Sequence, residues 1–197
     1  MRILIADDDP LIAFALAERV RSLGHEPLGP VADGAQAVAE ATATPPDLYL
    51  FDIEMPELDG LAAAAELTAR GLGGPVVVIT GVDDRGLIER SVATGAGAYL
   101  TKPIDTRELE AAISVAAARH AELQELQAKV TQTKQTLEER KIIERAKGLL
   151  MKALGLAEPD AFRRLQLAAR ERNLRLVDVA RAIVEQQDIL ESPSAKK

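Results

Sequence analysis

The sequence predicts an α/β fold, a doubly wound five-stranded parallel sheet, followed by a coiled-coil helix and a small all-α domain of three helices. Three observations lead to this prediction. Short apolar runs alternate with helical patterns through residues 1–118, which is typical of a parallel sheet with helical crossovers. A seven-residue apolar repeat comes next, and amphipathic helical segments fill the last third of the chain. These two patterns favour a coiled coil and a helical domain, respectively.

The predicted strands are short apolar runs, several of them rich in β-branched residues. The run at residues 48–51, directly before Asp52, is apolar and partly aromatic, as in a strand buried on both faces of a sheet. Residues 76–79 form the clearest buried run, and residues 27–31 the weakest. We expect strands, in order, at residues 2–6, 27–31, 48–51, 76–79 and 98–100.

The helices between these strands are bounded by residues that favour helix ends. Pro10 fits the first turn of a helix, and Asp59 fits the N-cap position of another. Pro45 and Pro46 stop an alanine-rich helix. We expect helices at residues 10–24, 34–43, 59–69 and 84–93. The apolar face of the first should consist of Leu11, Phe14, Ala15 and Val20.

A long helical pattern starts at Thr106 and contains no proline or glycine before Gly148. Its seven-residue repeat consists of Leu109, Ala116, Leu123, Val130 and Leu137, with Ala112, Leu126 and Thr133 at the intervening positions. Such a seam predicts a coiled coil that joins two copies into a homodimer. Because Arg119 and Arg140 also fall on it, the coil should be only marginally stable alone. The alternative is a single amphipathic connector that packs on its own domains.

The last third of the chain holds three helical segments. Gly155 ends the first, Pro159 opens the second, and Asn173 lies between the second and the third. The inward faces should consist of Ile143, Ala146, Leu150 and Leu154, then Phe162, Leu165 and Ala169, then Leu176, Val177, Ala180, Ile183 and Val184. We therefore expect domains at 1–118, 119–137 and 138–190, and a disordered tail at 191–197 with nothing to bury.

Composition restricts the class of protein. None of the 197 residues is cysteine, which excludes a disulfide framework and a thiol nucleophile. No apolar run approaches the roughly 20 residues of a membrane helix, so we expect a cytoplasmic protein without a membrane partner. Residues 1–120 hold nine Lys and Arg against 19 Asp and Glu, whereas residues 140–181 hold 11 against five. An acidic front and a basic back suggest different partners for the two ends.

Polar residues end four of the predicted strands. Asp7 to Asp9 follow the first, Asp52 the third, Thr80 the fourth and Lys102 the fifth. The carboxyl ends of parallel strands share one edge of a sheet, where α/β proteins bind ligands. Clustered carboxylates suit Mg²⁺, a lysine and a threonine suit a phosphoryl group, and a carboxylate is a competent nucleophile that forms an acyl phosphate.

With these residues, the sequence resembles the receiver domain of two-component response regulators over residues 1–118. The motifs are Asp7-Asp8, Asp52 with Met55-Pro56 and Asp59-Gly60, Thr80-Gly81, and Tyr99 before Lys102-Pro103. The resemblance implies a flavodoxin-like receiver fold, a cis Lys102–Pro103 bond and a sensor histidine kinase as partner.

The receiver resemblance also implies a role for each residue of the site. Asp52 is then the phosphoacceptor, and Mg²⁺ is bound by Asp8, Asp52 and the Glu54 backbone carbonyl, with Asp7 assisting through water. Thr80 and Lys102 contact the phosphoryl group, and Tyr99 moves inward as Thr80 closes on it. We assign no role to Asp9.

The C-terminal part resembles the ANTAR domain of transcription antitermination regulators. The motif residues are Glu144 to Met151, then Asp160-Ala161-Phe162 with Leu165 and Ala169, then Asp178-Val179-Ala180. This resemblance implies a dimer that binds RNA hairpins in nascent transcripts. Small residues beside Lys147 leave the backbone open to a phosphate or a base, and nearby basic residues add charge. We assign the RNA surface to Arg140, Lys141, Arg145, Ala146, Lys147, Gly148 and Lys152.

Two other functions compete with a phosphorylation-switched RNA-binding regulator. A DNA-binding output requires a compact helix-turn-helix, and the tail lacks a tight glycine turn between its second and third helices. A Mg²⁺-dependent phosphohydrolase requires a substrate lid, and no insertion supplies one. We therefore expect no enzyme beyond self-phosphorylation at Asp52 and autodephosphorylation.

Overall fold

The structure, a computed structural model, describes residues 1–81 and 97–191. The helix expected at residues 84–93 and residues 192–197 of the tail expected at 191–197 lie outside the described residues, whereas Glu191 is the last residue of a helix. The chain forms two compact units, Met1–Glu125 and Leu126–Lys197. No helix among the described residues has the length and apolar content needed to cross a membrane.

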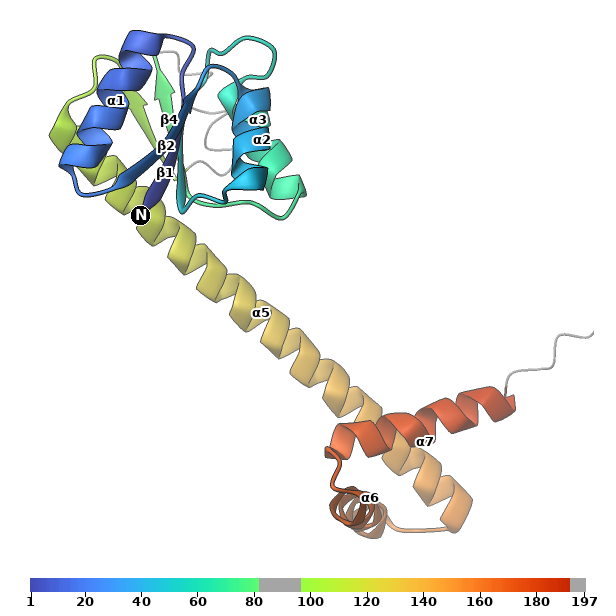
Figure 1. Ribbon diagram of the computed structural model, residues 1–197. Helices are drawn as coiled ribbons and strands as arrows, with labels where there is room; N and C mark the ends of the chain where they lie inside the picture. Colours follow the sequence, from blue (N-terminus) through green and yellow to red (C-terminus); the bar gives the residue numbers. More distant parts are fainter. Residues whose placement is uncertain (82–96, 192–197) are drawn as a thin grey trace, which may run out of the picture. The chain divides into compact units, whose positions relative to one another are not determined.

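The N-terminal unit is built on a parallel five-stranded sheet in the order β2-β1-β3-β4-β5, which confirms the predicted fold class (Figure 1). Its strands are β1 (Arg2–Ala6), β2 (Glu26–Val31), β3 (Leu48–Asp52), β4 (Val76–Thr80) and β5 (Ala98–Thr101). Every residue of β3 and β4 is buried, because helices cover both faces of the sheet.

Helices α1 and α5 lie on one face of the sheet and α2 and α3 on the other (Figure 1). Their bounds are α1 (Pro10–Ser22), α2 (Gly34–Ala43), α3 (Gly60–Ala69) and α5 (Thr106–Leu154). Alternate residues of the central strands enter the two cores: Ile3 and Ile5 pack toward α1 and α5, whereas Leu4 packs toward α2 and α3. The central strands therefore bury apolar side chains on both faces of the sheet.

The prediction of the buried face of α1 is wrong. Leu11 and Phe14 are 80% and 63% exposed, and of the expected face only Val20 is buried. The buried residues are Ala13, Leu16, Ala17 and Val20, a spacing of three and four that marks one side of a helix. Small alanines let α1 approach the sheet closely, which leaves the bulkier Leu11 and Phe14 facing water.

Carboxylate caps start the helices of the N-terminal unit. Asp59 accepts a hydrogen bond from Ala62 N at 2.7 Å and so caps α3 as predicted. Asp9, to which the sequence assigned no role, caps α1 by accepting hydrogen bonds from the backbone N–H groups of Leu11 and Ile12 at 2.8 and 3.3 Å. Such caps satisfy donors that have no partner within the helix.

Helix α5 is continuous over its 49 residues. The boundaries expected near residues 118 and 137 therefore lie inside one helix, which passes through Gly148 and ends before Gly155, a residue with φ of +64°. Between residues 121 and 138 every side chain is exposed. Leu123, Leu126 and Val130 of the predicted seam are each about half exposed, so no described part of this chain covers it.

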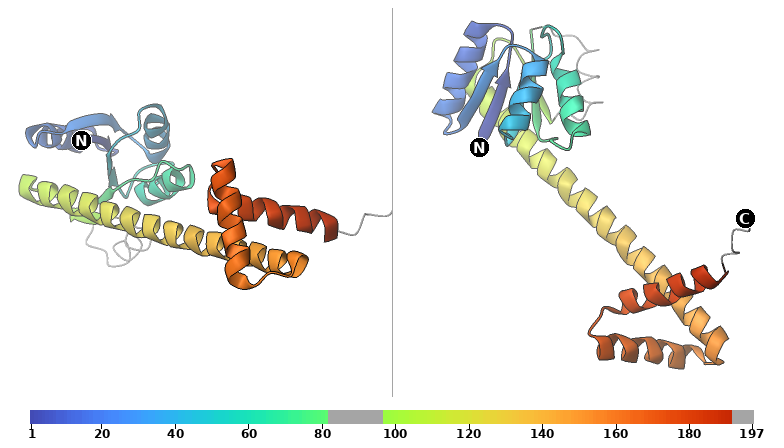
Figure 2. Two further views of the ribbon diagram at one scale, coloured as in Figure 1. Left: turned by 90° about the horizontal axis from the view of Figure 1, so that it is seen from below. Right: turned by 45° about the vertical axis from the view of Figure 1, so that its right-hand side comes forward.

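The C-terminal unit consists of the end of α5, α6 (Glu158–Arg172) and α7 (Leu176–Glu191). Figure 2 shows α6 and α7 lying across this part of α5. The buried core contains Ala146, Leu165, Ala169, Val179, Ala180 and Val184. Phe162, expected in the core, is 36% exposed, because Ala161 takes the inward position one turn before Leu165.

Candidate functional site

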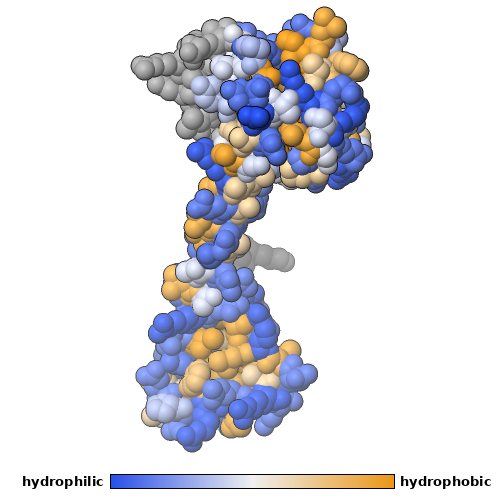
Figure 3. All heavy atoms as spheres, turned by 90° about the vertical axis from the view of Figure 1, so that its left-hand side faces the viewer, coloured by the Kyte–Doolittle hydropathy of each residue, from blue (hydrophilic) through white to orange (hydrophobic). Residues whose placement is uncertain are grey.

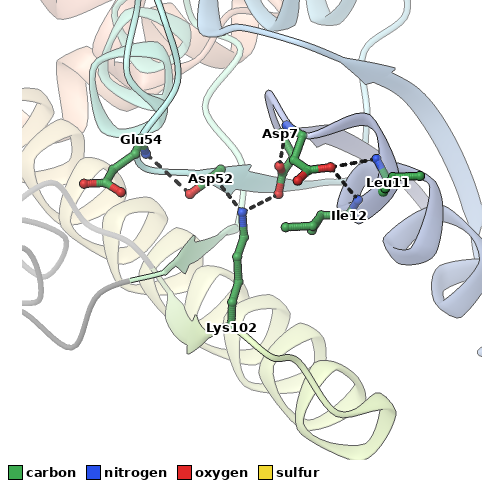
Figure 4. Close-up of polar contacts among 7 residues, drawn as sticks. Asp7, Leu11, Ile12, Asp52, Glu54 and Lys102 are labelled. Atoms are coloured by element: carbon green, nitrogen blue, oxygen red, sulfur yellow. Dashed lines mark hydrogen bonds and ion pairs between the residues drawn. The ribbon is translucent and has the colours of Figure 1, made fainter.

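Two buried carboxylates face one lysine at the edge of the sheet. Lys102 Nζ lies 2.8 Å from Asp7 Oδ2 and 2.6 Å from Asp52 Oδ2. Figure 4 shows the Lys102 side chain extending between the two acids. Asp7 and Asp52 are almost fully buried, and Lys102 is only partly so. The two ion pairs with Lys102 offset part of the cost of burying these carboxylates side by side.

The sheet register brings these side chains together. In the pairing of β1 with β3, Ala6 lies beside Phe51, so Asp7 and Asp52 are the next residues of neighbouring strands. The backbone N–H of Lys102 donates to the Thr80 carbonyl at 2.8 Å, which holds the end of β5 against β4. The Lys102–Pro103 bond is cis, as expected.

Gly60 places the start of α3 directly behind Asp52. A Cβ atom at residue 60 would lie 2.0 Å from the Asp52 carbonyl oxygen, well inside any possible contact. The sequence pair Asp59-Gly60 therefore combines a helix cap with a residue that lets the backbone of α3 lie close to the backbone of β3. This close approach fixes the position of the Asp52 backbone.

Burial and charge act in opposite directions on the ionisable groups of this site. Burial raises the pKa of Asp7 above its ordinary value, although hydrogen bonds from Lys102 and from the Asp9 N–H lower it. Burial alone would lower the pKa of Lys102, but hydrogen bonds to Asp52 and Asp7 raise it overall. The lysine therefore stays charged at neutral pH.

The same acids could hold a metal ion. Asp7, Asp8 and Asp52 each offer one carboxylate oxygen, and these oxygens lie within 4.8 Å of one another. Asp7 Oδ2 is buried, and its charged neighbour is Lys102 Nζ, 2.8 Å away. A set of hard carboxylate oxygens of this kind fits Mg²⁺. The residues present therefore suit this ion.

The other predicted residues of the site differ in position. Thr80 is buried at the end of β4, one residue past the pairing of Asp52 with Ile79. Tyr99 is 41% exposed on β5. The Glu54 side chain points away from Asp52 in Figure 4, and its backbone N–H lies 3.4 Å from Asp52 Oδ1. The role of the Glu54 backbone carbonyl as a metal ligand stays a prediction.

The residues assigned to RNA fall into two groups. Arg140, Lys141, Arg145, Gly148 and Lys152 are exposed on α5. Ala146 is fully buried and Lys147 is 8% exposed, which differs from the open surface expected around them. Ala146 lies in the three-helix core, because it occupies the face of α5 that packs on α6 and α7.

Lys147 is held by two carboxylates and an aromatic ring. Its Nζ lies 2.8 Å from Glu144 and 2.7 Å from Glu158, and 5.8 Å from the centre of the Phe162 ring. Hydrogen bonds to Glu144 and Glu158 raise the pKa of Lys147. The spacing of Glu144 and Lys147 on one helix could have indicated this pair, whereas Glu158 is brought in only by the tertiary fold.

Comparisons with known proteins agree with both units. Residues 3–114 match the response regulator receiver domain, and residues 131–184 match the ANTAR domain. The transcriptional regulatory protein PdtaR of Mycobacterium tuberculosis is 42% identical over 93% of this chain and 89% of its own length.

Two solved structures are similar to the N-terminal unit. The signal receiver domain of a modulated diguanylate cyclase from Desulfovibrio desulfuricans is 33% identical, with a TM-score of 0.56 over 61% of this chain and 95% of that one. The receiver domain of the sensor histidine kinase PA1611 from Pseudomonas aeruginosa is 34% identical, with a TM-score of 0.50 over 55% and 90% of the two chains. That structure contains a magnesium ion coordinated in its active site cleft.

Proposed function

Because this chain belongs to the response regulators with a receiver domain and an ANTAR domain, we propose that phosphorylation of Asp52 controls binding of RNA hairpins by its C-terminal unit. The bound hairpins then regulate gene expression by transcription antitermination. The observation that carries this proposal is the buried pair of Asp7 and Asp52 facing Lys102, in a chain that continues into a basic helical unit.

Asp52 acts as the nucleophile toward phosphorus. Its carboxylate oxygen attacks the phosphoryl group of a phosphohistidine, the P–N bond breaks, and an acyl phosphate forms. Lys102 moves its ion pair from Asp52 to a phosphoryl oxygen, and the Thr80 hydroxyl donates a hydrogen bond to another. Asp7, Asp8, Asp52 and the Glu54 carbonyl are the groups suited to hold Mg²⁺, which neutralises phosphoryl charge when bound. We propose no substrate beyond this self-phosphorylation and its reversal.

A sensor histidine kinase is the proposed phosphodonor, and an exposed apolar surface next to the site is suited to receive it. Leu11 and Phe14 on α1 face solvent. A cavity of about 510 Å³ adjoins Leu11 and is lined by Leu11, Ile12, Ala15, Arg19, Lys102, Pro103 and Ile104. Because Lys102 lines this cavity and also contacts Asp52, a protein seated there would lie next to the phosphoacceptor.

The exposed seam of α5 supports the proposed homodimer. Leu123, Leu126, Val130 and Leu137 are the apolar residues that a second copy would cover. Knobs-into-holes packing of this seam removes them from water. If phosphorylation favours the dimer, the coupling free energy should be of the usual size, about 1–3 kcal/mol.

The exposed basic residues of the C-terminal unit support an RNA partner. Arg140 and Lys152 have no ion pair or hydrogen bond within the part of the chain that the structure describes. The excess of 11 basic over five acidic residues in 140–181 attracts phosphates to this unit, while the acidic N-terminal unit repels them.

The test uses the full chain, Mg²⁺ and a small-molecule acyl phosphate as phosphodonor. Mass spectrometry should find one base-labile phosphoryl group on Asp52, and none in Asp52→Asn. The phosphorylated protein should bind a pool of RNA hairpins more tightly and should increase read-through of a terminator in transcription with purified components. A phosphoryl group found on another residue would overturn the proposal. Equal hairpin affinity of the phosphorylated and the unphosphorylated protein would overturn it as well.

A further inference from the structure

Helix α6 carries four arginines that are not equivalent. Arg163 lies 3.9 Å from Asp160, whereas Arg164, Arg170 and Arg172 form no ion pair or hydrogen bond with any described residue. Arginine guanidinium groups without a protein partner are free to meet phosphates or to stack on flat rings. Of these three, Arg164 and Arg172 line the two hollows described next, and Arg170 lines neither.

Two hollows lie next to each other along α6. The first, of about 360 Å³, has an apolar floor formed by Leu150 of α5, Leu165 and Ala168 of α6 and Ile183 of α7. The second, of about 370 Å³, lies over Leu154 and Leu156. Arg164 and Leu167 line both hollows, so these two residues form the ridge between them.

Large apolar side chains on the walls of these hollows are open to water, and charged side chains lie beside them. Leu167 is 49% exposed and Leu154 is 54% exposed, although both residues are large and lie beside a packed core. Figure 3 shows apolar residues gathered on one face of the C-terminal unit and edged by hydrophilic ones. Apolar floors with cationic rims suit a ligand that has flat, weakly polar rings and negative charge on the same molecule.

An unstacked nucleobase attached to its phosphate has this chemistry. RNA loops expose bases that can stack on arginine planes and form hydrogen bonds with their edges. Each hollow is at the small end of the range for ligand sites, roughly 300–1,000 Å³. Glu171 on the rim of the first hollow and Asp160 on the rim of the second are acceptors for base amino groups. These acids would repel a bare phosphate, so they favour a base over the backbone.

A protein helix fits the hollows less well than RNA does. An apolar helix of a second copy would cover Leu167 but would also bury the unpaired guanidinium groups of Arg164 and Arg172. Burial of an unpaired charge is costly. RNA avoids this cost, because each base carries a phosphate that can pair with a guanidinium group.

We propose that these two hollows each bind one unstacked base of an RNA loop, with Arg164 stacked between the two bases. This inference rests on the proposed RNA-binding function and adds the site at which loop sequence is read.

The test compares two charge-matched variants of the phosphorylated full chain, Arg164→Ala and Arg170→Ala. Both remove one unpaired arginine from α6, but Arg170 lines neither hollow. With a pool of RNA hairpins of randomised loop sequence as probe, Arg164→Ala should weaken binding about tenfold or more, as loss of base stacking does. It should also broaden the set of loops that are selected. Arg170→Ala should change affinity less than Arg164→Ala and leave the selected loops unchanged.

A second pair of variants tests the hollow itself. Ala168→Leu places a larger side chain in the first hollow, and Ala182→Leu makes the same change at an exposed position of α7. Leucine is a good helix former, so both variants should keep the Tm of the wild type. Ala168→Leu should weaken hairpin binding and Ala182→Leu should not.

The outcomes separate this inference from the function on which it rests. If the wild type binds no hairpin, the proposed RNA function is wrong. If the wild type binds but Arg164→Ala behaves like Arg170→Ala, the base-binding hollows are wrong while the RNA function stands. A change of sedimented mass in Arg164→Ala with unchanged RNA binding would assign the hollows to contact between copies and would also overturn the inference.

Discussion

Two lysines in this protein are each held by two carboxylates, yet their surroundings give them different roles. Lys102 meets the buried Asp7 and Asp52, so its charge offsets the cost of burying two carboxylates inside the protein. Lys147 meets Glu144 and Glu158, whose side chains are more than half exposed. That pair joins α5 to the start of α6 at the surface, where its contribution is smaller and screened by salt.

The ion pair of Lys147 with Glu158 should make stability depend on pH. The lysine lowers the pKa of Glu158 below its ordinary value of 4.5. A lowered folded-state pKa stabilises the protein above the unfolded pKa, and this contribution is lost as the pH falls through the folded value. Glu158→Gln should therefore lower the Tm near pH 7, and the difference from wild type should fade as the pH drops below 4.5.

Thermal unfolding at neutral and acidic pH tests this expectation. Glu185→Gln, at an exposed position of α7, is the matched control and should leave the Tm unchanged. A Tm difference for Glu158→Gln that persists in acid would show that the charge of this pair is not the cause. Because Lys147 supports the fold, RNA binding by its variants has to be compared at equal folded fraction.

Gly60→Ala should damage the phosphoacceptor site without touching any of its polar groups. The new methyl group would lie 2.0 Å from the Asp52 carbonyl oxygen, so α3 and β3 must move apart. Such overpacking costs about 1–3 kcal/mol, and it should slow phosphorylation of Asp52. Unfolding and phosphodonor labelling measure the two effects. Wild-type behaviour in both would mean that the backbones do not approach so closely.

At the scale of single elements, α5 combines three functions along one helix. Its first turns, including Leu109 and Ile113, complete the core of the N-terminal unit, and Ala146 enters the core of the C-terminal unit. The segment between them is exposed on every side. Most of the stability of helices in proteins comes from packing rather than from propensity, so partners at both ends and along the seam should matter.

Gly148→Ala should have opposite effects on the stability of the protein and on its affinity for RNA hairpins. Gly148 lies inside α5, and a Cβ atom there would meet nothing within 4 Å. Alanine should therefore stabilise the helix by up to about 1 kcal/mol. If RNA approaches the backbone at Gly148, hairpin binding should weaken although the Tm rises. A rise in Tm with unchanged hairpin affinity would place the RNA away from this residue.

Replacement of one leucine of the α5 seam by a charged residue should prevent dimerisation. Leu126→Glu puts a carboxylate at the centre of the predicted coil, where burial of an unpaired charge is costly. Sedimentation of the phosphorylated protein should then give the mass of one chain. Gln132→Glu adds the same charge at an exposed position off the seam and should leave the dimer intact. Equal masses for these two variants would remove the coiled coil as the interface.

At the scale of the whole molecule, phosphorylation and RNA binding should be coupled through the dimer. Residues 1–120 are acidic and residues 140–181 are basic, so the two ends suit different partners and need a shared event to communicate. The proposed dimer through α5 would provide one, because it would change the number of RNA-binding units that act together.

The coupling predicts how Leu126→Glu should bind RNA. Its Asp52 should be phosphorylated at the wild-type rate, since Leu126 belongs to the C-terminal unit. The gain in hairpin affinity on phosphorylation, expected at about 5–150-fold for an allosteric regulator, should be lost. A binding titration with and without phosphodonor measures it. A full gain in this variant would mean that phosphorylation acts on each chain separately.

The sequence by itself determined the order of the described elements and which residues meet at the proposed phosphoacceptor site. Strand ends can be read locally, and parallel strands bring Asp7, Asp52 and Lys102 to one edge whatever the details of packing. The first-turn position of Pro10, the cap at Asp59 and the helix end at Gly155 are also local, because each depends on the chemistry of a single residue.

Only the tertiary structure decided which side of each helix is buried and which charges meet. The orientation of α1 depends on how closely small residues such as Ala13 and Ala17 can approach the sheet, so Leu11 and Phe14 were misplaced. Phe162 was misplaced because the inward position of α6 belongs to Ala161. Lys147 lies beside Glu158 through packing of α6 on α5. Because the two residues belong to different helices, the periodicity of a single helix cannot predict this contact.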